Sequence, residues 1–519
     1  MNLKKELSKF KPVQLESRFS ELEKWEKEVV LKLVQVSKIT SEIFFDQTYS
    51  KNKEAYIKVI EEGDIDKLKF FEFMKGPFNR IKHNESFVFG HKKPLGSNFY
   101  PEDMSKDEFE KHIKEHPEDK EKFTSEYTLI RRNKKGELIA IPYSEAYNEQ
   151  LKKASDLLKE TANISKDKTL KKYLSQLSES ILKNDYFQSD CAWMDLNSKL
   201  EPLIGPYEVY EDELFGYKAS FESVISIKDK KETEKLKHLE ELMLEFDSYL
   251  PIKTPFPRKG KHSPTIVVNG IHSGGDCRAG IHFVAFNLPN DEKVRDLKGS
   301  KKVMFKNIME AKFYYCSEPI CKEVLKKEQH NLISFDSYFM HVVLHEISHG
   351  IGPGKIFNDQ KETTVNKALK ETYSTIEELK ADICGVYSSF LLEEKKIMTK
   401  KEVKKLIACF LAMTYRSLRF GLNEAHAGSN LIILNYFKEK GNLIYDKKEN
   451  NYAVNFECIK DTVKELVTEI LTIQSNGDYK RAKQFMAKYK TVNGEIKNML
   501  KKMKHIPTDI NIKYELDEQ

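Results

Sequence analysis

One short segment, HVVLHEISHGIGPG at residues 341–354, constrains this chain more than any other. His345 and His349 are four residues apart, so on an α-helix both rings lie on one face, one turn apart. Apolar residues precede the pair, which favours a buried helix, and the Gly and Pro residues that follow end it. Two neutral imidazoles placed in this way can occupy adjacent corners of a zinc tetrahedron, and Glu346 can take a proton from zinc-bound water.

A second predicted helix offers a third metal ligand. Glu378 and Asp382 are four residues apart at the start of an apolar segment. A Glu in this place can ligate zinc, while the Asp accepts the N–H of a ligating His and fixes its tautomer. Two alternatives remain open: His345 and His349 as core histidines bonded to backbone oxygens, and an acidic helix start that only reflects the helix dipole. We expect His341, on the same face as His345, in the core or behind the ligands.

The apolar pattern changes twice along the chain. From Leu15 to Val36 apolar residues recur every three or four positions, which predicts a long helix over 14–44. Helical patterns continue to about 200, and a zone rich in Gly, Pro and aromatic residues follows. In that zone we expect strands at 223–227, 265–270 and 280–290 and a helix at 233–250. Beyond about 302 the pattern is helical again, with long segments around 335–350, 374–394, 402–420 and 456–473.

Charge and cysteine content exclude several classes of protein. The net charge of +6 over 519 residues provides no electrostatic basis for nucleic-acid binding. The apolar stretch at 406–415 is half the length that a membrane span requires, and the N-terminal segment lacks the apolar region of a signal peptide. Seven scattered cysteines are typical of reduced thiols. We therefore expect a cytoplasmic protein that binds neither membranes nor nucleic acids.

These motifs resemble the dipeptidyl peptidase III family of zinc peptidases. That family pairs an HExxGH helix with an EExxA(E/D) helix, and the second motif stands here as EELKAD at 377–382. HEISH has five residues where most of the family has six, and this shorter form is similar to a bacterial branch and to the domain fused to some Nudix hydrolases. The chain itself contains no Nudix box. The resemblance implies zinc ligands at His345, His349 and Glu378, with Asp382 and Glu377 behind them.

Three further segments support the resemblance, which runs from about residue 200 to 430. The first is EVY at 208–210, in which the family uses the Glu for the substrate's amino terminus and the Tyr for the scissile carbonyl. The second is NLPN at 287–290, whose two Asn bind the peptide near its N-terminus. The third is EAH at 424–426, whose His helps to stabilise the transition state, although the following AGSN departs from the family pattern.

By position, the resemblance assigns Glu208, Asn287 and Asn290 to substrate binding, and Tyr210 and His426 to catalysis. Alternatives that need no substrate remain for some of them. Tyr210 can be a core residue, and the two Asn can be turn residues around a proline.

The family fold implies an α+β, mostly helical protein of two lobes with a cleft between them. One lobe is helical and holds the zinc, and the other is mixed, with a small β-barrel core. The family's lobes are discontinuous in sequence. We therefore expect a mixed lobe at 1–228, largely helical to about 200, and its return at 263–315. The zinc lobe is expected at 229–262 and 316–519.

The predicted activity is that of a zinc-dependent exopeptidase that releases dipeptides from the N-terminus of short peptides, with one zinc per chain. Glu346 acts as the base. One alternative is a zinc hydrolase acting on a non-peptide amide or ester, and another is a non-catalytic peptide-binding protein on the same fold. An intact Glu346 argues against the second alternative, because a binding protein needs no general base. The sequence makes no prediction of the oligomeric state.

Overall fold

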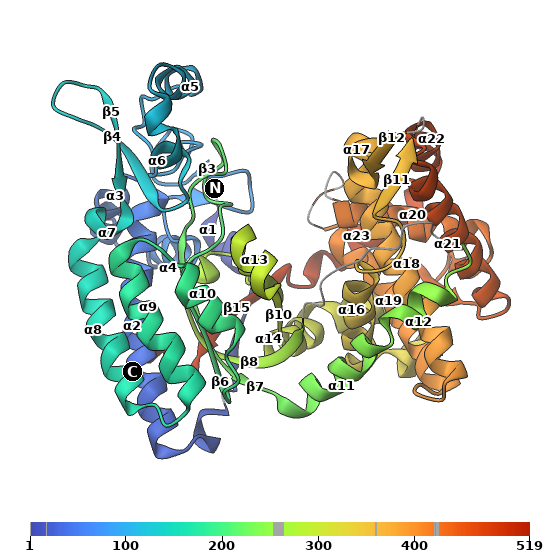
Figure 1. Ribbon diagram of the computed structural model, residues 1–519. Helices are drawn as coiled ribbons and strands as arrows, with labels where there is room; N and C mark the ends of the chain where they lie inside the picture. Colours follow the sequence, from blue (N-terminus) through green and yellow to red (C-terminus); the bar gives the residue numbers. More distant parts are fainter. Residues whose placement is uncertain are drawn as a thin grey trace. The chain divides into compact units, whose positions relative to one another are not determined.

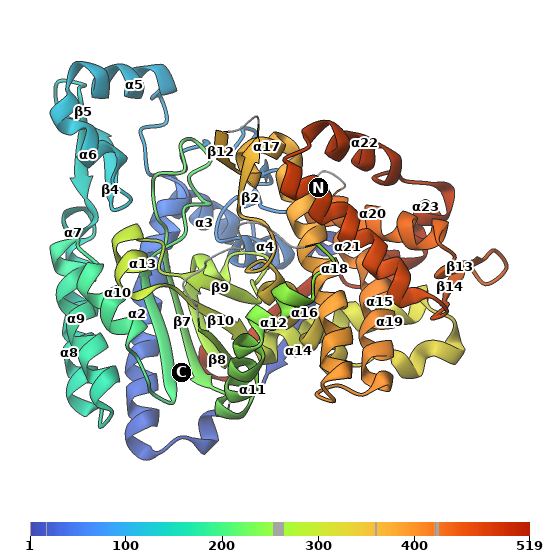
Figure 2. The same ribbon diagram turned by 45° about the vertical axis from the view of Figure 1, so that its right-hand side comes forward.

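The computed structural model describes residues 2–16, 18–252, 264–358, 361–419, 421 and 425–518 (Figures 1 and 2). The chain divides into two compact units, each built from segments that are distant in sequence. Unit 1 comprises Met1–Thr233, His262–Ile308 and Ile510–Gln519, and unit 2 comprises Glu234–Lys261 and Met309–Asp509. The expected boundary at 262–263 lies outside the described residues.

A five-stranded sheet forms the centre of unit 1. In spatial order its strands are β6 (Leu200–Pro206), β7 (Phe221–Lys228), β8 (Thr265–Gly275), β10 (Lys301–Phe305) and β9 (Ala285–Leu288). β10 runs parallel to β8, and the other neighbours are antiparallel. Closing a barrel requires the first and last strands to pair. Among the described strands, the edge strands β6 and β9 do not pair with each other, so the sheet is open and the predicted β-barrel is wrong.

Helix α2 (Lys24–Thr48) packs across β7 and β8. Gly274 makes this close approach possible, because a Cβ at that position would lie 2.4 Å from the hydroxyl oxygen of Ser37. The Ser37 hydroxyl is also 2.7 Å from that of Ser223 on β7. Helices α8 (Asn148–Ile164) and α9 (Lys168–Lys183) continue this layer beside α2 (Figure 1). Strands β6, β7, β8 and β10 are buried almost throughout, as expected for strands covered on both faces, whereas the edge strand β9 is mostly half-buried or exposed.

The predicted helix over 14–44 is partly wrong. The helix begins at Lys24, because Glu23 and Glu26 form a capping box there. Residues Phe10–Leu15 instead form strand β1, which pairs with β15 (Asp509–Tyr514) at the other end of the sequence.

The other helices and hairpins of unit 1 are α1 (Leu3–Leu7), α3 (Asn52–Glu61), α4 (Ile65–Met74), α5 (Lys106–Glu115), α6 (Lys120–Thr124), α7 (Tyr143–Ala146), α10 (Phe187–Met194), α13 (Glu292–Lys298) and the hairpins β2–β3 (Phe78–Asn79, Glu85–Ser86) and β4–β5 (Thr128–Arg132, Leu138–Pro142).

Unit 2 is helical and is arranged around α18 (Tyr373–Glu394). This helix contacts α16 (Phe335–Ser348), α19 (Lys400–Ser417), α20 (Ala425–Glu439) and α21 (Ile459–Asn476), and it is buried over most of its length. Helices α16, α18, α19 and α21 match the predicted segments, whereas α20 was not predicted. The mostly helical α+β class is confirmed. Unit 2 also contains α12 (Met243–Tyr249), α15 (Glu318–Val324), α17 (Val365–Leu369), α22 (Tyr479–Tyr489), α23 (Gly494–Lys502) and the hairpins β11–β12 (Lys355–Asn358, Lys361–Thr364) and β13–β14 (Leu443–Asp446, Asn451–Val454). Two helices, α11 (Lys230–Glu241) and α14 (Lys306–Lys312), contain residues of both units.

Helices α16 and α18 approach each other closely at Gly385. A Cβ at this position would lie 3.0 Å from the backbone nitrogen of His345. A larger residue would force the two helices apart. The glycine therefore sets the spacing at which side chains of α16 meet side chains of α18.

All seven cysteines are free thiols, and five of them are buried. This agrees with the expectation of scattered reduced thiols. Within the described ranges, no helix has both the length and the apolar character needed to cross a membrane.

Candidate metal centre and acidic pocket

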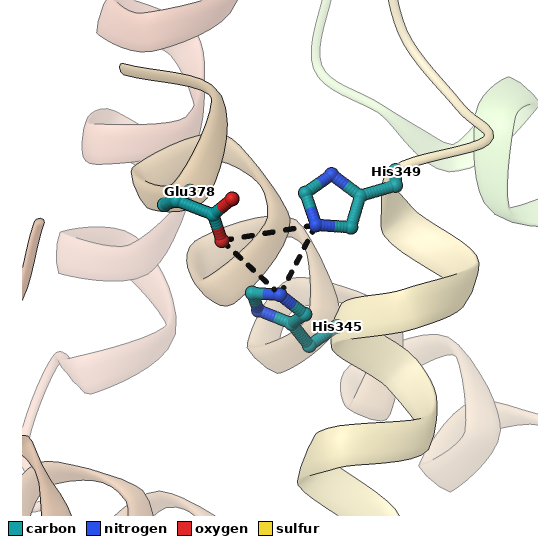
Figure 3. A group of neighbouring side chains, drawn as sticks. All are labelled: His345, His349 and Glu378. Atoms are coloured by element: carbon teal, nitrogen blue, oxygen red, sulfur yellow. Dashed lines mark hydrogen bonds and ion pairs between the residues drawn. The ribbon is translucent and has the colours of Figure 1, made fainter. Parts of the chain in front are cut away.

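Three side chains of unit 2 converge on one point (Figure 3). The Nε2 atoms of His345 and His349 are 3.1 Å apart. Oε2 of Glu378 lies 3.4 Å from Nε2 of His345 and 3.8 Å from Nε2 of His349. Ligand atoms bound at about 2.0–2.1 Å around a tetrahedral zinc lie about 3.3 Å from one another. The three atoms therefore have the spacing of a metal-binding triad.

The helices explain this convergence. His345 lies in the last turn of α16 and His349 at its C-cap, so the two rings project from one face. Glu378 comes from the second turn of α18. The close contact of the two helices at Gly385 brings the carboxylate to the rings.

Each histidine has a carboxylate behind it. Nδ1 of His345 lies 2.7 Å from Oδ1 of Asp382, and Nδ1 of His349 lies 3.1 Å from Oε1 of Glu377. An ionised carboxylate only accepts hydrogen bonds, so it holds the ring proton on Nδ1 and leaves the lone pair of Nε2 for a metal. This is the tautomer that both rings need if their Nε2 atoms are to be ligands.

Two residues that the sequence analysis did not single out hold Glu377 in place. Lys380, which is fully buried, lies with its Nζ 2.9 Å from Oε1 of Glu377, and Nε2 of Gln474 donates to Oε2 at 2.9 Å. Nζ of Lys380 also donates to the backbone oxygens of Ser348 and Ile351 at the end of α16. A lysine in a buried helix, three residues after a glutamate, was the signal available in the sequence for this link.

The centre has an excess of negative charge that calls for a cation. Burial alone would lower the pKa of His345, but Asp382 and Glu378 outweigh burial and raise that pKa to about 10. Burial would raise the pKa of Glu378, but His345 and His426 lower it to about 2. The raised pKa of His345 indicates that positive charge is favoured at this place. A metal cation fits the same place and the same donor atoms.

Glu346 and His426 lie at this centre without belonging to the triad. Glu346 is half-buried beside His345, and its negative charge contributes to the raised pKa of that ring. His426, in the first turn of α20, is 53% exposed, and its Nδ1 lies 3.1 Å from Oε2 of Glu378. Glu424, from the same predicted segment, lies outside the described residues. His341 packs its ring against Phe410 with centroids 4.3 Å apart, and its Nε2 lies 3.5 Å from Asp382.

The other predicted residues meet in unit 1. Glu208, Tyr210, Asn287 and Asn290 all line one cavity of about 500 Å³, which we call the acidic pocket. Tyr210 is 79% exposed, so it is not a core residue. Asn290 donates to the backbone oxygen of Tyr207 at 3.0 Å. Burial raises the pKa of the Glu208 carboxyl, and Arg295 opposes that shift.

Sequence reasoning missed two more acids in the acidic pocket, Glu222 and Asp276. Glu222 is buried and accepts from the thiol of Cys277 at 3.0 Å, while its Oε1 has no hydrogen-bond partner in the part of the chain that is described. Burial raises the pKa of Glu222 well above its usual range. Burial together with the nearby Glu211 raises the pKa of Asp276 to about 7. The Phe-Glu pair at 221–222 and the Gly-Gly-Asp at 274–276 were the available signals.

Comparisons with known proteins agree with one another. The model of peptidase family M49 matches residues 102–388. Nudix hydrolase 3 of Arabidopsis thaliana is 35% identical over an alignment of 576 positions, which covers 100% of this chain and 74% of that protein. The structure of DPP III from Caldithrix abyssi is 45% identical with a TM-score of 0.96, covering 99% of each chain. The structure of dipeptidyl-peptidase III from Corallococcus sp. strain EGB is 36% identical with a TM-score of 0.81, covering 99% of this chain and 96% of that one.

Proposed function

The chain belongs to peptidase family M49, as its motifs indicated, and we propose that it is a zinc-dependent dipeptidyl peptidase that acts on the N-terminus of short peptides. The observation that supports the proposal best is the triad of His345, His349 and Glu378 with a carboxylate behind each ring. The acidic pocket, a second site built for a cationic group, supports the choice of substrate.

The donor set favours zinc as the resident metal, with one ion per chain. Two imidazoles and one carboxylate are a ligand set that catalytic zinc sites use, with the fourth position left for water or substrate. Zinc bound there supplies an activated water molecule and polarises the scissile carbonyl.

Glu346 moves the proton in this proposal. Its carboxylate adjoins His345 on α16 without being one of the three ligand atoms. We assign it to accept the proton of the attacking water and to pass it to the nitrogen of the leaving peptide. The C–N bond then breaks, and the two products are a dipeptide acid and a peptide with a new free amine.

Tyr210 and His426 are assigned to the oxygen of the scissile carbonyl, where negative charge develops. The phenol of Tyr210 is exposed at the edge of the acidic pocket, and its pKa is raised, chiefly by Glu208, so it stays protonated and able to donate. The ring of His426 lies beside Glu378. Hydrogen bonds donated to that oxygen would lower the barrier by stabilising the charge that develops there.

The acidic pocket is proposed to bind the free α-ammonium of the peptide. Glu208 supplies the charge partner, and the amides of Asn287 and Asn290 pair with the first peptide groups. Glu222 and Asp276 also line the pocket, and burial is the main cause of their raised pKa values, so a bound ammonium group would favour their ionised forms. Fixing the amino terminus fixes the register, so that the cut falls after the second residue.

One experiment tests the proposal as a whole. The purified protein is analysed for metal and then incubated with a free-amine heptapeptide, and the first products are identified by mass spectrometry. We expect about one zinc per chain and release of the N-terminal dipeptide. Single amino acids or internal fragments as first products would contradict the dipeptidyl assignment, while zinc-dependent cleavage of esters alone would favour a non-peptide hydrolase. The predicted cytoplasmic location remains a prediction.

A further inference from the structure

One wall of the acidic pocket is the short segment that follows β8. Asp276, Cys277, Ala279 and Ile281 line the cavity. The segment starts at Gly275, whose φ is +67° and where a Cβ would lie 2.2 Å from the backbone oxygen of Phe221. Such a short distance rules out any side chain at 275. The backbone therefore fixes the start of this wall against β7.

The middle of the wall is held by a side chain. Arg278 lies between the lining residues and binds both carboxylate oxygens of Asp517: its Nη1 donates to Oδ1 at 2.5 Å, and its Nη2 donates to Oδ2. The guanidinium group also lies over the ring of Tyr514, 5.3 Å from its centroid. A bidentate pair of this kind fixes orientation as well as distance.

Asp517 itself is fixed on three sides. Besides Arg278, it accepts from the backbone nitrogen of Tyr514 at 2.9 Å, and Nδ1 of the buried His272 on β8 lies 3.3 Å from its Oδ1. Burial would raise the pKa of Asp517, but the hydrogen bonds from Arg278 outweigh burial and hold it well below its usual range, so the pair is ionised at neutral pH.

The segment that carries Asp517 is firmly attached to unit 1. Strand β15 pairs with β1. Three side chains of the strand and one that follows it are nearly or fully buried, namely Ile510, Ile512, Tyr514 and Leu516. The bond between Arg278 and Asp517 therefore ties the pocket wall to a packed strand, and not to a loose chain end.

From these contacts we propose that Asp517 is a positioning residue for substrate binding: through Arg278 it sets the place of Asp276 and Cys277 in the acidic pocket. The proposal rests on the proposed function of that pocket. Without the carboxylate of Asp517, Arg278 keeps the half-buried Lys75 as a cationic neighbour, whose pKa is lowered to about 8 by desolvation and by Arg278. Repulsion between the two would then displace Arg278 and the wall with it.

The test compares Asp517→Asn with the wild type as zinc-loaded, full-length proteins that release dipeptides from a free-amine peptide. We expect KM to rise about tenfold, the size of one lost charge-assisted hydrogen bond to the peptide, and kcat to stay within about twofold. Zinc content should not change, because all three candidate ligands lie in unit 2. Glu61→Gln, an exposed acid of α3 in the same unit, is the matched control and should leave KM unchanged.

A double variant shows whether Asp517 acts through Arg278 or through the stability of unit 1. Arg278→Gln should raise KM to the same extent, and the double variant should be no worse than either single one. Asp517→Glu, which keeps the charge, should recover part of the loss, and it replaces the Asn variant if that variant does not fold. An unchanged KM in folded Asp517→Asn, or additive effects in the double variant, would overturn the proposal. A wild type that releases no dipeptide would instead refute the proposed function.

Discussion

Nδ1 of His345 lies 2.7 Å from Oδ1 of Asp382, and the two residues come from helices that meet at a glycine. The same helix, α18, supplies Glu378 to the metal triad and Glu377 to Nδ1 of His349. One helix therefore carries a ligand and both groups that orient the histidines. Within α18, the spacing of 377, 378 and 382 fixes which acid faces the metal and which acids face the rings.

Asp382→Asn should weaken metal binding without removing a ligand. The amide has the same shape, but it can present its N–H₂ to the ring, which favours the wrong tautomer of His345. We expect zinc affinity to fall about 10- to 100-fold, measured by competition with a chelator of known affinity. Ser429→Ala is the control, because that hydroxyl donates to the other oxygen of Asp382 across 3.3 Å. Equal losses in both variants would mean that Asp382 acts through general packing.

Removal of a ligand should have a larger effect. His349→Ala and Glu378→Ala each reduce the protein ligands from three to two, and we expect both proteins to lose tight zinc binding. Metal content after dialysis against a weak chelator measures this directly, and His341→Ala should retain the metal. Wild-type affinity in Glu378→Ala would show that the third ligand lies elsewhere, with His341 the first residue to test.

Glu346→Gln should separate chemistry from binding. The variant keeps all three ligands but lacks the base, so zinc content should remain at about one per chain. Turnover should fall about 10²–10⁴-fold, the usual contribution of a general acid–base group. Stopped assays with dipeptidyl-naphthylamides provide the rate. A zinc-loaded Glu346→Gln protein with the wild-type kcat would exclude the proposed mechanism.

Local sequence patterns predicted those parts of the fold and of the metal centre that depend on residues close together in the sequence. The apolar period and the Gly-rich stop predicted α16, and the spacing from Glu378 to Asp382 predicted which face of α18 bears acids. Both rely on i, i+4 geometry, which the sequence carries directly.

The parts that were missed depend on distant partners. Strand β1 forms because β15, about 500 residues later, pairs with it, and no local pattern in 10–15 contains that information. Whether the five-stranded sheet closes depends on strand tilt, which side-chain alternation does not report. Gln474 and Asp276 acquire their roles only once helices and strands from separate segments are packed together.

A blocked amino terminus should be a poor substrate. Acetylation removes the charge that Glu208 is proposed to bind, and loss of a charge-assisted hydrogen bond costs about 1.5–3 kcal/mol, or tenfold or more in kcat/KM. Glu208→Gln should therefore harm free-amine peptides more than their acetylated forms, as followed by mass spectrometry on peptide pairs. Equal kcat/KM for free and acetylated peptides would remove the dipeptidyl assignment but leave the metal site intact.

Unit 1 should lose stability in acid through Glu211. This buried carboxylate binds Arg80 at 2.5 Å and Lys93 at 2.6 Å, and the two cations outweigh burial and lower its pKa to about 2. A folded-state pKa below the unfolded value means that the stabilisation is complete above about pH 4.5 and is lost as the pH falls towards 2, up to about 3 kcal/mol in total. Both tryptophans, Trp25 and Trp193, lie in unit 1, so their fluorescence during urea unfolding reports on this unit alone.

The matched pair of variants for this prediction is Glu211→Gln and Glu213→Gln. The first leaves two cations without their carboxylate and should be destabilised at pH 7 by about 3–5 kcal/mol, the usual cost of breaking a buried pair. Its difference from the wild type should shrink as the pH is lowered from 5 to 3, because the carboxylate of Glu211 takes up a proton in the unfolded wild type over this range while it stays ionised in the folded protein, which favours unfolding. Glu213 is bonded to Asn84 at the surface, and its variant should unfold like the wild type at every pH. A constant difference across this pH range would show that Glu211 stabilises unit 1 through packing and not through its charge.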